Sequence, residues 1–411
     1  MNHTTPAEEI VTLLDNYRET DRPLRILAAL QFYLPHRTGY SLHVQRVAEG
    51  LAARGHQVTV LTARHHIDLP RDETINGVRI VRLWAPIKVS RGMVMPAYPW
   101  SMWGFLRQND VVWLNLPMLE TALTAFLAKR ARRGLIATHH GDLLLGPGLK
   151  NQFIQWFTFQ NYRYMANRAS RLIAYSHDYA DHSYYLEDYR DKVSVIFPPI
   201  QIPHPEPQRA AELRERWQHN GGPIIGYAGR FVKEKRPDLL IRSLEIINEH
   251  YPNARVVFAG EYDIKYENTW EENQPLVRRF EEQLIFLGLI TSAQALANFY
   301  AACDVIVLPS DTECFALVQV EGMMCGTPIV ATDIPGARVP LQETGMGQIV
   351  PRGDHQAIGE AVVKILQNPE RYRHTREEIE TFFNYDETIS RYEKHLRNAA
   401  RTSIYHKNEA R

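Results

Sequence analysis

Short runs of apolar and β-branched residues alternate with longer segments of helical periodicity along most of this chain, in two separate stretches. Such alternation is typical of parallel β-α-β construction, in which a helix crosses over between neighbouring strands. A proline-dense stretch, FPPIQIPHPEP, divides the two stretches, because proline removes a backbone donor and fixes φ. The sequence therefore predicts an α/β protein with two doubly wound, Rossmann-like domains.

The pattern also predicts where the domains and strands lie. We expect a polar N-terminal extension at 1–23, a first domain at 24–200, a linker at 201–207, a second domain at 208–380, and a C-terminal helix and tail at 381–411. Strands are expected at 25–30, 57–62, 78–83, 111–114, 135–138, 171–175, 193–197, 224–228, 256–259, 284–287, 304–308 and 329–332. In the second domain, helices are expected at 237–247, 275–283, 293–301 and 318–325.

The charge of the chain is balanced overall but uneven along it. Lysine plus arginine equals aspartate plus glutamate at 47 each, so no basic excess indicates a nucleic-acid partner. Residues 1–200 hold 23 basic and 17 acidic side chains, whereas residues 201–411 hold 24 and 30. The positive first half, with the run Lys129, Arg130, Arg132 and Arg133, predicts peripheral contact with an anionic membrane or an acidic ligand. The alternative is a solvated helix face.

The chain carries no sign of export or of a membrane span. Its three cysteines, Cys303, Cys314 and Cys325, lack disulfide or zinc spacing and fit a reducing cytoplasm. The first 23 residues lack the apolar core of a signal peptide, which argues against a periplasmic two-domain binding protein. No window approaches 18 uninterrupted apolar residues. We expect a cytoplasmic protein, at the inner face of the membrane if the basic run binds there, with no metal site.

The first strand-to-helix turn narrows the ligand classes. It reads QFYLPHRTGYS, with the single glycine Gly39 and neither a dinucleotide-binding G-x-G-x-x-G nor a P-loop. The sequence therefore lacks the motifs that would indicate a dinucleotide oxidoreductase or a P-loop ATPase. Gly39 is either a plain turn glycine or a position where a ligand approaches the backbone beside helix amides.

The second domain opens with GYAGRFVKEKRPDLL, which places two cations after a strand. Gly229 and Arg230 follow the strand directly, and Lys235 precedes the helix that Pro237 starts. An arginine fork and a lysine point charge beside a helix N-terminus can bind a phosphate group. Alone, this motif does not separate a phosphate site from solvated loop cations.

A later segment, PSDTECFALVQVEGMMCGTPIVATDIPG, contains two glutamates eight residues apart, Glu313 and Glu321. Eight residues of helix rise amount to at most about 12 Å. Two carboxylates that flank one glycosidic bond need roughly 5–10 Å, so this spacing suits the two ends of a long ligand instead. A helix that starts near Phe315 or Ala316 would present free amides to a diphosphate between them.

Taken together, these motifs resemble the retaining glycosyltransferases of family 4 (GT4), which have the GT-B fold. The resemblance covers roughly residues 24–370 and depends on the joint order of several motifs. These are Tyr33-x-Pro35 with Gly39, Arg54-Gly55-His56, Thr138-x-His140-Gly141-Asp142, Gly229-Arg230 with Lys235, Pro309-Ser310, Glu313–Glu321, Gly326-x-Pro328 and Thr332-Asp333-x-Pro335-Gly336.

The resemblance implies two domains facing across a cleft, the first for the acceptor and the second for the donor, with a C-terminal helix that crosses back to the first. It implies a metal-independent hexosyltransferase that moves a hexose-type sugar, with retention, from a nucleotide diphosphate sugar to a glycan or lipid-linked acceptor. No cofactor is implied beyond that co-substrate.

The resemblance also assigns roles to individual residues. Glu313 would contact hydroxyls of the donor sugar, Glu321 the ribose, and Arg230 with Lys235 the diphosphate. His140 would act catalytically near the reacting carbon. The remaining donor-binding positions would be Gly39, Gly229, Phe315, Ala316, Leu317 and Val318, the last four through their amides.

Three positions depart from the family pattern, and two alternatives stay open. Ala316 stands where glycine is common, Gly322 where alanine is common, and Tyr40 replaces the second glycine of a Gly-Gly turn. A sugar-nucleotide epimerase or phosphorylase on the same fold would use the same residues, as would a catalytically inactive sugar-nucleotide-binding module. The donor base is undetermined, because backbone groups near 258–261 and 287–289 would bind it.

Overall fold

The computed structural model describes residues 22–89, 92–143, 148–264 and 267–408, so the predicted extension at 1–23 lies almost entirely outside the described residues. The chain divides into two compact units. The first contains the described residues up to Ala174, then Ser183–Ile196, and the C-terminal residues from Asp386. The second contains Tyr175–His182 and Phe197–Tyr385. The short segment Tyr175–His182 thus belongs to the second unit, which the sequence pattern did not indicate.

The first unit is built on an eight-stranded sheet with the order β10-β9-β8-β7-β1-β2-β4-β3, and every neighbouring pair is parallel except β3 with β4. Its central strand, VVWLNL, is buried along its whole length, as expected for a parallel strand covered on both faces. The strands are β1 (Arg25–Ala29), β2 (Gln57–Arg64), β3 (Asp72–Ile75), β4 (Val78–Trp84), β7 (Val111–Leu116), β8 (Gly134–His139), β9 (Arg171–Ala174) and β10 (Val193–Val195). A separate antiparallel pair consists of β5 (Ile87–Val89) and β6 (Gly92–Val94).

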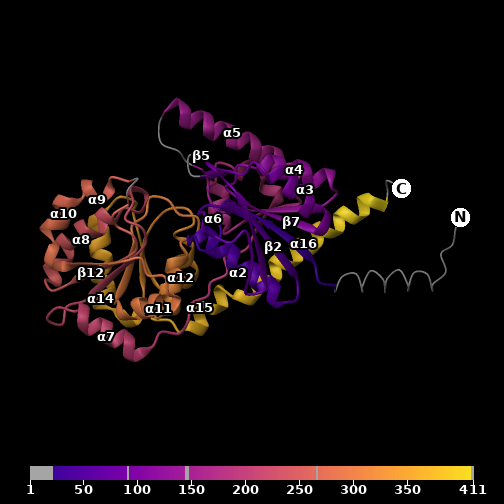
Figure 1. The fold of residues 1–411 in the computed structure, drawn as a ribbon. Coiled ribbons are helices and arrows are strands. Elements are labelled where there is room, and N and C mark those ends of the chain that lie inside the picture. Colours follow the sequence, from indigo (N-terminus) through magenta and orange to yellow (C-terminus); the bar gives the residue numbers. More distant parts are fainter. Residues whose placement is uncertain (1–21, 90–91, 144–147, 265–266, 409–411) are drawn as a thin grey trace. The chain divides into compact units, whose positions relative to one another are not determined.

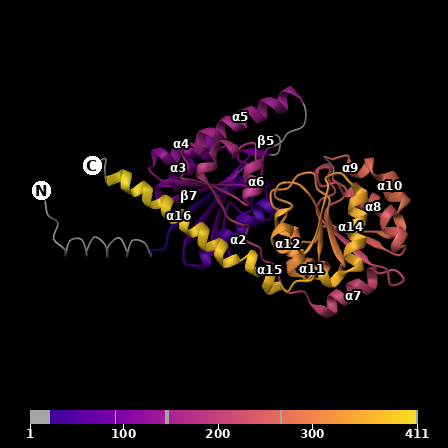
Figure 2. The same ribbon diagram turned by 180° about the vertical axis from the view of Figure 1, so that it is seen from behind.

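Helices cover both faces of this sheet (Figure 1). They are α2 (Gly39–Ala53), α3 (Tyr98–Gln108), α4 (Thr121–Arg130), α5 (Leu149–Ala166), the 3-10 helix η1 (Glu187–Lys192) and α16 (Tyr385–Asn408). Both views place α3, α4 and α5 on one face, with α2 and α16 on the other (Figure 2). On that second face Tyr392 of α16 bonds to His43 of α2 at 2.8 Å, which fixes the C-terminal helix to the first unit.

The second unit has a six-stranded, fully parallel sheet with the order β13-β12-β11-β14-β15-β16. Its strands are β11 (Ile224–Ala228), β12 (Arg255–Ala259), β13 (Leu284–Gly288), β14 (Val305–Leu308), β15 (Ile329–Thr332) and β16 (Gly347–Val350). The α-helices are α6 (His177–His182), α7 (Pro207–Trp217), α8 (Pro237–His250), α9 (Thr269–Glu272), α10 (Gln274–Arg279), α11 (Ala293–Ala302), α12 (Leu317–Met324), α13 (Val339–Thr344), α14 (His355–Gln367) and α15 (Arg376–Phe382). The 3-10 helices are η2 (Lys233–Lys235), η3 (Glu281–Gln283) and η4 (Pro369–Tyr372).

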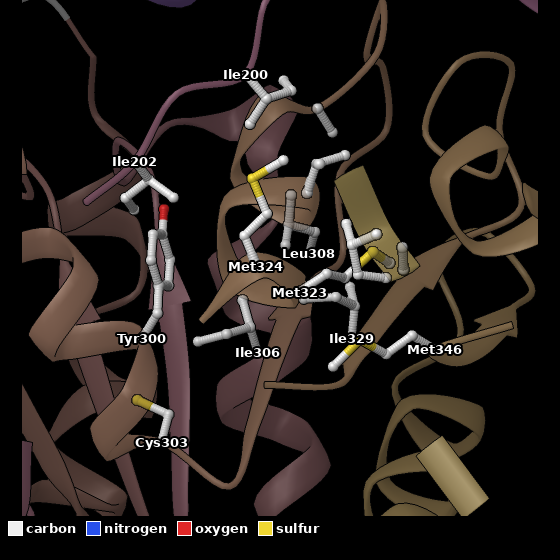
Figure 3. Close-up of a cluster of buried hydrophobic side chains, with 14 of the residues drawn as sticks. Ile200, Ile202, Tyr300, Cys303, Ile306, Leu308, Met323, Met324, Ile329 and Met346 are labelled. Carbon is white, nitrogen blue, oxygen red and sulfur yellow. The ribbon is translucent and has the colours of Figure 1, made fainter. Parts of the chain in front are cut away.

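Alternation along these strands produces two cores, one on each face of the sheet. Ile306 belongs to the core formed with α11 and α12, whereas its neighbour Val305 belongs to the core formed with α8 and α14. Figure 3 shows the first of these cores, where Met323 and Met324 of α12 lie among Ile306 and other side chains of the strands. This packing holds α12, the helix that carries Glu321, against β14 and β15.

The strands that the periodicity predicts are all present, with ends shifted by a few residues, but four others were missed. These are β3, β5, β6 and β16, which are short or lie at sheet edges. The sequence did contain one signal for the β3–β4 hairpin, the dipeptide Asn76-Gly77. In the structure both residues have positive φ, as a two-residue hairpin turn requires. The helix expected at 275–283 is broken into α10 and η3, and α7 begins at Pro207, inside the predicted linker.

No helix among the described ranges is long and apolar enough to cross a membrane. None of the three cysteines forms a disulfide bond.

Glu120, at the start of α4, predicts an unusual pH dependence of stability. Burial raises the pKa of this carboxyl to about 7, although Oε1 accepts a hydrogen bond from the Met95 amide at 3.3 Å. The folded chain therefore keeps a proton that the unfolded chain releases above its ordinary pKa. The stability tied to that proton is present below about pH 4.5 and is lost as pH rises through 7.

We therefore expect Glu120→Gln to be more stable than the wild type by about 2 kcal/mol near pH 8, and almost unchanged near pH 4. Urea unfolding at the two pH values measures this, with the exposed Glu187→Gln as the control. Equal gains at both pH values would contradict the assignment.

Candidate functional site

In the second unit, the loops that follow β11 and β14 are tied together by hydrogen bonds. The amide of Asp311 donates to the carbonyl of Glu234 at 2.8 Å. Arg236, which has a positive φ of 48°, forms two 3.0 Å hydrogen bonds to Asp238 and lies 3.5 Å from a carboxylate oxygen of Asp311. Because β11 and β14 are neighbours, residues that are distant in sequence meet at one end of the sheet.

This arrangement brings two predicted site residues into direct contact. Lys235 Nζ lies 2.5 Å from Glu313 Oε1, and Ser310 Oγ donates to the same oxygen at 2.9 Å. Both side chains of the ion pair are largely shielded, with 25% of Lys235 and 12% of Glu313 exposed. Among the described residues, Oε2 of Glu313 accepts no hydrogen bond, so it is the oxygen available to a ligand hydroxyl.

Two buried hydroxyl groups donate hydrogen bonds to the backbone of the loop segments that carry this pair. Thr332 Oγ1, at the end of β15, donates to the carbonyl of Ser310 at 2.6 Å. Tyr227, in β11, donates its hydroxyl to the carbonyl of Arg230 at 2.9 Å. Burial, and then the nearby Glu313 carboxylate, raise the pKa of Tyr227 well above its usual value, so this hydroxyl remains a donor.

Gly229 and Arg230 lie in the loop after β11, beside the pair but not in it. Arg230 Nη2 is 3.6 Å from Glu234 Oε1, and both side chains are partly exposed. Gly260 permits a close approach of two loops, because a Cβ on it would lie only 2.0 Å from the Gly229 carbonyl oxygen. The structure thus places both cations of the predicted phosphate motif in one loop, with Lys235 against a glutamate.

The start of α12 is suited to an anion because no side chain caps it. The helix begins at Leu317, one or two residues later than the sequence indicated, after Ala316 in the left-handed conformation with φ 57°. The amides of Leu317 and Val318 have no acceptor within the helix. Phe315 contributes only its backbone, because its ring is buried against Tyr175, Phe197 and Phe383.

The positive φ of Ala316 explains why glycine is common at this position of the family pattern, because glycine adopts the left-handed conformation without strain. An L-residue in the left-handed region costs about 1 kcal/mol relative to glycine. We therefore expect Ala316→Gly to raise the free energy of unfolding by about 0.5–1 kcal/mol, measured as a higher urea midpoint. Ala302→Gly, in the last turn of α11 where glycine brings no relief, is the control and should be destabilised. A lower urea midpoint for Ala316→Gly would contradict the proposal that the backbone at Ala316 is strained.

Glu321 occupies a different environment from Glu313. Its side chain is only 6% exposed, and Tyr300 Oη donates to Glu321 Oε2 at 3.4 Å. Figure 3 shows Tyr300 rising from α11 with its hydroxyl directed toward Ile202. Glu321 is therefore a largely buried carboxylate that accepts a hydrogen bond from Tyr300.

A second turn buttresses the loop of Glu313. Gly336 has φ 81°, and a Cβ there would lie 2.4 Å from the carbonyl oxygen of Cys314. Asp178 of α6 accepts hydrogen bonds from the Gly336 amide at 3.0 Å and from both ends of the Arg338 guanidinium at 2.5 and 3.0 Å. Burial would raise the pKa of Asp178, but these hydrogen bonds outweigh burial and lower it. This network explains why Tyr175–His182 belongs to the second unit.

In the first unit, His140 lies just beyond the end of β8 in a network of neutral groups. Its Nε2 is 2.9 Å from Asn115 Oδ1, which accepts, so Nε2 carries the proton. Its ring contacts those of Tyr40 at 4.4 Å and His43 at 5.1 Å between centroids. Burial, and then the neighbouring rings of His43 and His139, lower the pKa of His140 well below its usual value. His140 is therefore a neutral imidazole at physiological pH.

Gly39 and Tyr40 form the first turn of α2. Thr38 and Ser41 make a reciprocal capping box, so this helix start already has a side-chain cap, unlike that of α12. Tyr40 donates its hydroxyl to the carbonyl of Asn115 at 3.0 Å. The residue that replaces glycine thus fixes the strand end that holds His140.

A cavity of about 140 Å³ lies beside Tyr40. Its walls are mostly apolar and come from the ends of β1 and β7, the β5–β6 pair and α5. Gln31 lies in this wall, is 4% exposed, and its Oε1 has no hydrogen-bond partner. The cavity suits an apolar group of a few carbon atoms.

Sequence reasoning missed several residues that position these sites. Asn115 stands inside a buried strand, and no motif in the sequence singled it out. Ser310 was recognised only as part of a motif, and Asp178 gave no local signal. Among the residues that the structure describes, no three His, Cys, Asp or Glu side chains form a group that could hold a metal ion.

Two family models match the chain. The one described as "Glycosyl transferases group 1" matches residues 210–382, and the one described as "Glycosyl transferase 4-like domain" matches residues 38–199. An uncharacterized glycosyltransferase of Methanocaldococcus jannaschii is 26% identical over 72% of this chain and 77% of its own length. A D-inositol 3-phosphate glycosyltransferase of Saccharomonospora viridis is 29% identical, over 49% of this chain and about half, 48%, of its own length.

A solved structure has a similar fold. The crystal structure of Anabaena HepE in complex with UDP and glucose gives a TM-score of 0.72 with 18% sequence identity, covering 91% of this chain and 99% of that one. At that identity the likeness shows the fold alone.

Proposed function

Because this chain belongs to glycosyltransferase family 4 and has the GT-B fold, we propose that it transfers a hexose-type sugar, with retention of configuration, from a nucleotide diphosphate sugar to an acceptor hydroxyl. The observation that carries the proposal is the Lys235–Glu313 pair in the second unit, in the same unit as the uncapped start of α12. A cation, a shielded carboxylate and free helix amides are the groups that a sugar diphosphate needs.

The proposed mechanism requires that the departing diphosphate be stabilised as the anomeric carbon becomes positive. Lys235 and Arg230, with the amides of Leu317 and Val318, supply positive charge and donors for that purpose. Oε2 of Glu313 accepts from a sugar hydroxyl, while Oε1 holds Lys235 in place. Glu321 binds the ribose. In this scheme no metal is needed, and the acceptor attacks the face from which the diphosphate leaves.

His140 and Gly39 are proposed site residues of the first unit. A neutral imidazole that donates through Nε2 to Asn115 keeps Nδ1 as its basic atom, and it carries no charge that would repel a cationic reacting carbon. Replacement of Asn115 would release the ring. We assign His140 a catalytic role and Gly39 a role beside the phosphates.

Of the two acceptor classes, the first unit favours a lipid-linked one. The apolar cavity beside Tyr40 can take a short hydrocarbon segment, and Gln31 Oε1 offers one acceptor to a hydroxyl of the same molecule. The positive charge of residues 1–200 supports contact with an anionic membrane, where such acceptors lie. A cytoplasmic location, at the inner face of that membrane, is part of this proposal.

A donor panel tests the assignment. Thermal shift is measured with UDP, GDP and ADP sugars, led by UDP-glucose because the structural neighbour holds UDP and glucose. Release of nucleoside diphosphate is then compared with and without lipid-linked and soluble glycan acceptors. Acceptor-dependent release supports transfer, an acceptor-independent conversion indicates an epimerase, and a thermal shift without turnover indicates a binding module. Release of a sugar 1-phosphate from a glycan and inorganic phosphate would indicate a phosphorylase.

A further inference from the structure

Large apolar side chains are exposed in unusual number on three adjacent helices of the first unit, α3, α4 and α5. Seven of them are between 39% and 85% exposed: Trp100, Trp103, Phe126, Leu149, Phe153, Trp156 and Phe157. We call this surface the α3–α5 face. Helix α4 contacts both α3 and α5, and Figures 1 and 2 show the three together on one side of the sheet. Monomeric soluble proteins rarely leave so large an apolar patch uncovered.

The exposed rings are not poorly packed core residues. Each helix buries a separate set of side chains, such as Met102 of α3, Ala125 of α4 and Tyr162 of α5. On α5, Phe153, Trp156 and Phe157 have the i, i+3, i+4 spacing of one helical stripe, and Phe153 lies within 6.5 Å of the other two rings. The helices therefore have two apolar sides, one facing the sheet and one facing outward.

The charge on these helices is one-sided. Across Tyr98–Gln108, Thr121–Arg130 and Leu149–Ala166 there is no aspartate or glutamate, although the chain has 47 acidic residues in all. The same helices carry five cations: Arg107, Lys129, Arg130, Lys150 and Arg163. Among the described residues, Arg163 is the only one of these five that forms an ion pair, with Asp188 at 2.9 Å. The face therefore combines aromatic rings with uncompensated positive charge.

From this combination we infer that the α3–α5 face docks on the surface of an anionic lipid bilayer. Tryptophan and phenylalanine insert at the headgroup level, while lysine and arginine attract anionic headgroups. A second copy of the chain is disfavoured, because two such faces would bring like charges together with no carboxylate to pair them. A bilayer meets the apolar and the electrostatic demand at once.

The inference deepens the membrane contact of the proposed function, and it relocates that contact. Within the basic run only Lys129 and Arg130 belong to the face, because Arg132 lies beyond the end of α4 and the half-buried Arg133 donates to the carbonyl of Arg107 at 3.3 Å. Helix α5 also supplies Ile154 and Thr158 to the apolar cavity beside Tyr40. A lipid-linked acceptor could thus meet the same helix at the bilayer and in the cavity.

The test is flotation of the full chain with phosphatidylcholine vesicles, with and without phosphatidylglycerol. We expect the wild type to float with the anionic vesicles. The variant Phe153→Ser/Trp156→Ser/Phe157→Ser should bind at least tenfold less. The matched control is Ile67→Ser/Trp84→Ser, which removes two similarly exposed apolar residues of the first unit from outside the face and should bind like the wild type. Lys129→Gln/Arg130→Gln should bind less and depend less on salt.

Each other outcome is decisive. If the wild type floats with no vesicle, both the membrane contact and the face are wrong. If the triple variant floats as well as the wild type does, the membrane contact stands but the aromatic residues of α5 do not make it, and the inference fails. If the wild type is a dimer that the triple variant loses, with no vesicle binding, the face is a contact between copies and the inference fails.

Two further measurements separate these results from misfolding and from the transfer reaction. Quenching of tryptophan fluorescence by brominated lipids should fall in Trp156→Phe and stay unchanged in Trp84→Phe. The thermal shift with a nucleotide sugar reports on the second unit, so it should be the same in the triple variant and the wild type. Failure to find any donor would overturn the proposed function but leave vesicle binding intact.

Discussion

Replacing Lys235 with alanine is expected to lower the rate of sugar transfer by about 100- to 1000-fold, as loss of one preorganised donor at a departing charged group does in other enzymes. The reason lies in the geometry of the pair, since Lys235 is held 2.5 Å from Glu313 Oε1 and three-quarters shielded from water. Its charge is therefore already positioned before a donor binds. The measurement is kcat with the donor and acceptor that the panel identifies.

The control is Lys233→Ala, which removes an exposed lysine of the same 3-10 helix. It should transfer sugar at nearly the wild-type rate. Glu313→Gln keeps an acceptor for Ser310 and for a sugar hydroxyl but removes the charge, so it should lose activity while its unfolding midpoint changes little. Near-normal turnover by both Lys235→Ala and Glu313→Gln would refute the assignment of this loop to the donor.

The second large effect is expected from Gly336→Ala. A Cβ at this position would lie 2.4 Å from the carbonyl oxygen of Cys314 and 3.0 Å from that of Glu313. Backbone atoms cannot rotate away as a flexible side chain does, so the loop that carries Glu313 must move. We expect a loss of about 3 kcal/mol in the free energy of unfolding, and at least tenfold weaker donor binding.

A second glycine provides a control that distinguishes the effect of this clash from the effect of a positive φ alone. Gly345 also has a positive φ, 68°, but a Cβ there meets nothing within 4 Å. Gly345→Ala should therefore cost only about 1 kcal/mol and leave donor binding unchanged. Equal losses in the two variants, in urea unfolding and in nucleotide-sugar thermal shift, would show that strain alone is responsible and that the turn does not support the site.

Local patterns in the chain were enough for most of the secondary structure and for the position of the candidate site residues after the strand ends. The apolar runs at 224–228 and 304–308 correspond to β11 and β14, because a buried parallel strand is apolar throughout and is bounded by polar residues. The motif residues Arg230, Lys235 and Glu313 do lie after the ends of these strands. The short edge strands were missed because a few half-exposed residues are too short a stretch to show a pattern of alternating apolar and polar residues.

The local sequence patterns could not predict contacts between segments that are distant in sequence. Lys235 was expected to bind the diphosphate and Glu313 the sugar of one ligand, whereas the structure also pairs them with each other. The pairing depends on β11 and β14 being neighbours in the sheet. The adherence of Tyr175–His182 to the second unit likewise depends on Asp178 meeting Gly336 and Arg338, more than 150 residues away in sequence.

The amino-acid sequence by itself determined the two α/β units, the family, and the glycines and charges at the strand ends, because those follow from periodicity and from motif order. Only the tertiary structure decided which side chains pair, which backbone positions are strained, and which apolar residues stay outside. Phe153 and Tyr162 are both aromatic residues of α5, yet one is 64% exposed and the other fully buried. The physical reason is that burial depends on which helices and strands surround a side chain, and that is set by sheet order rather than by neighbours in the sequence.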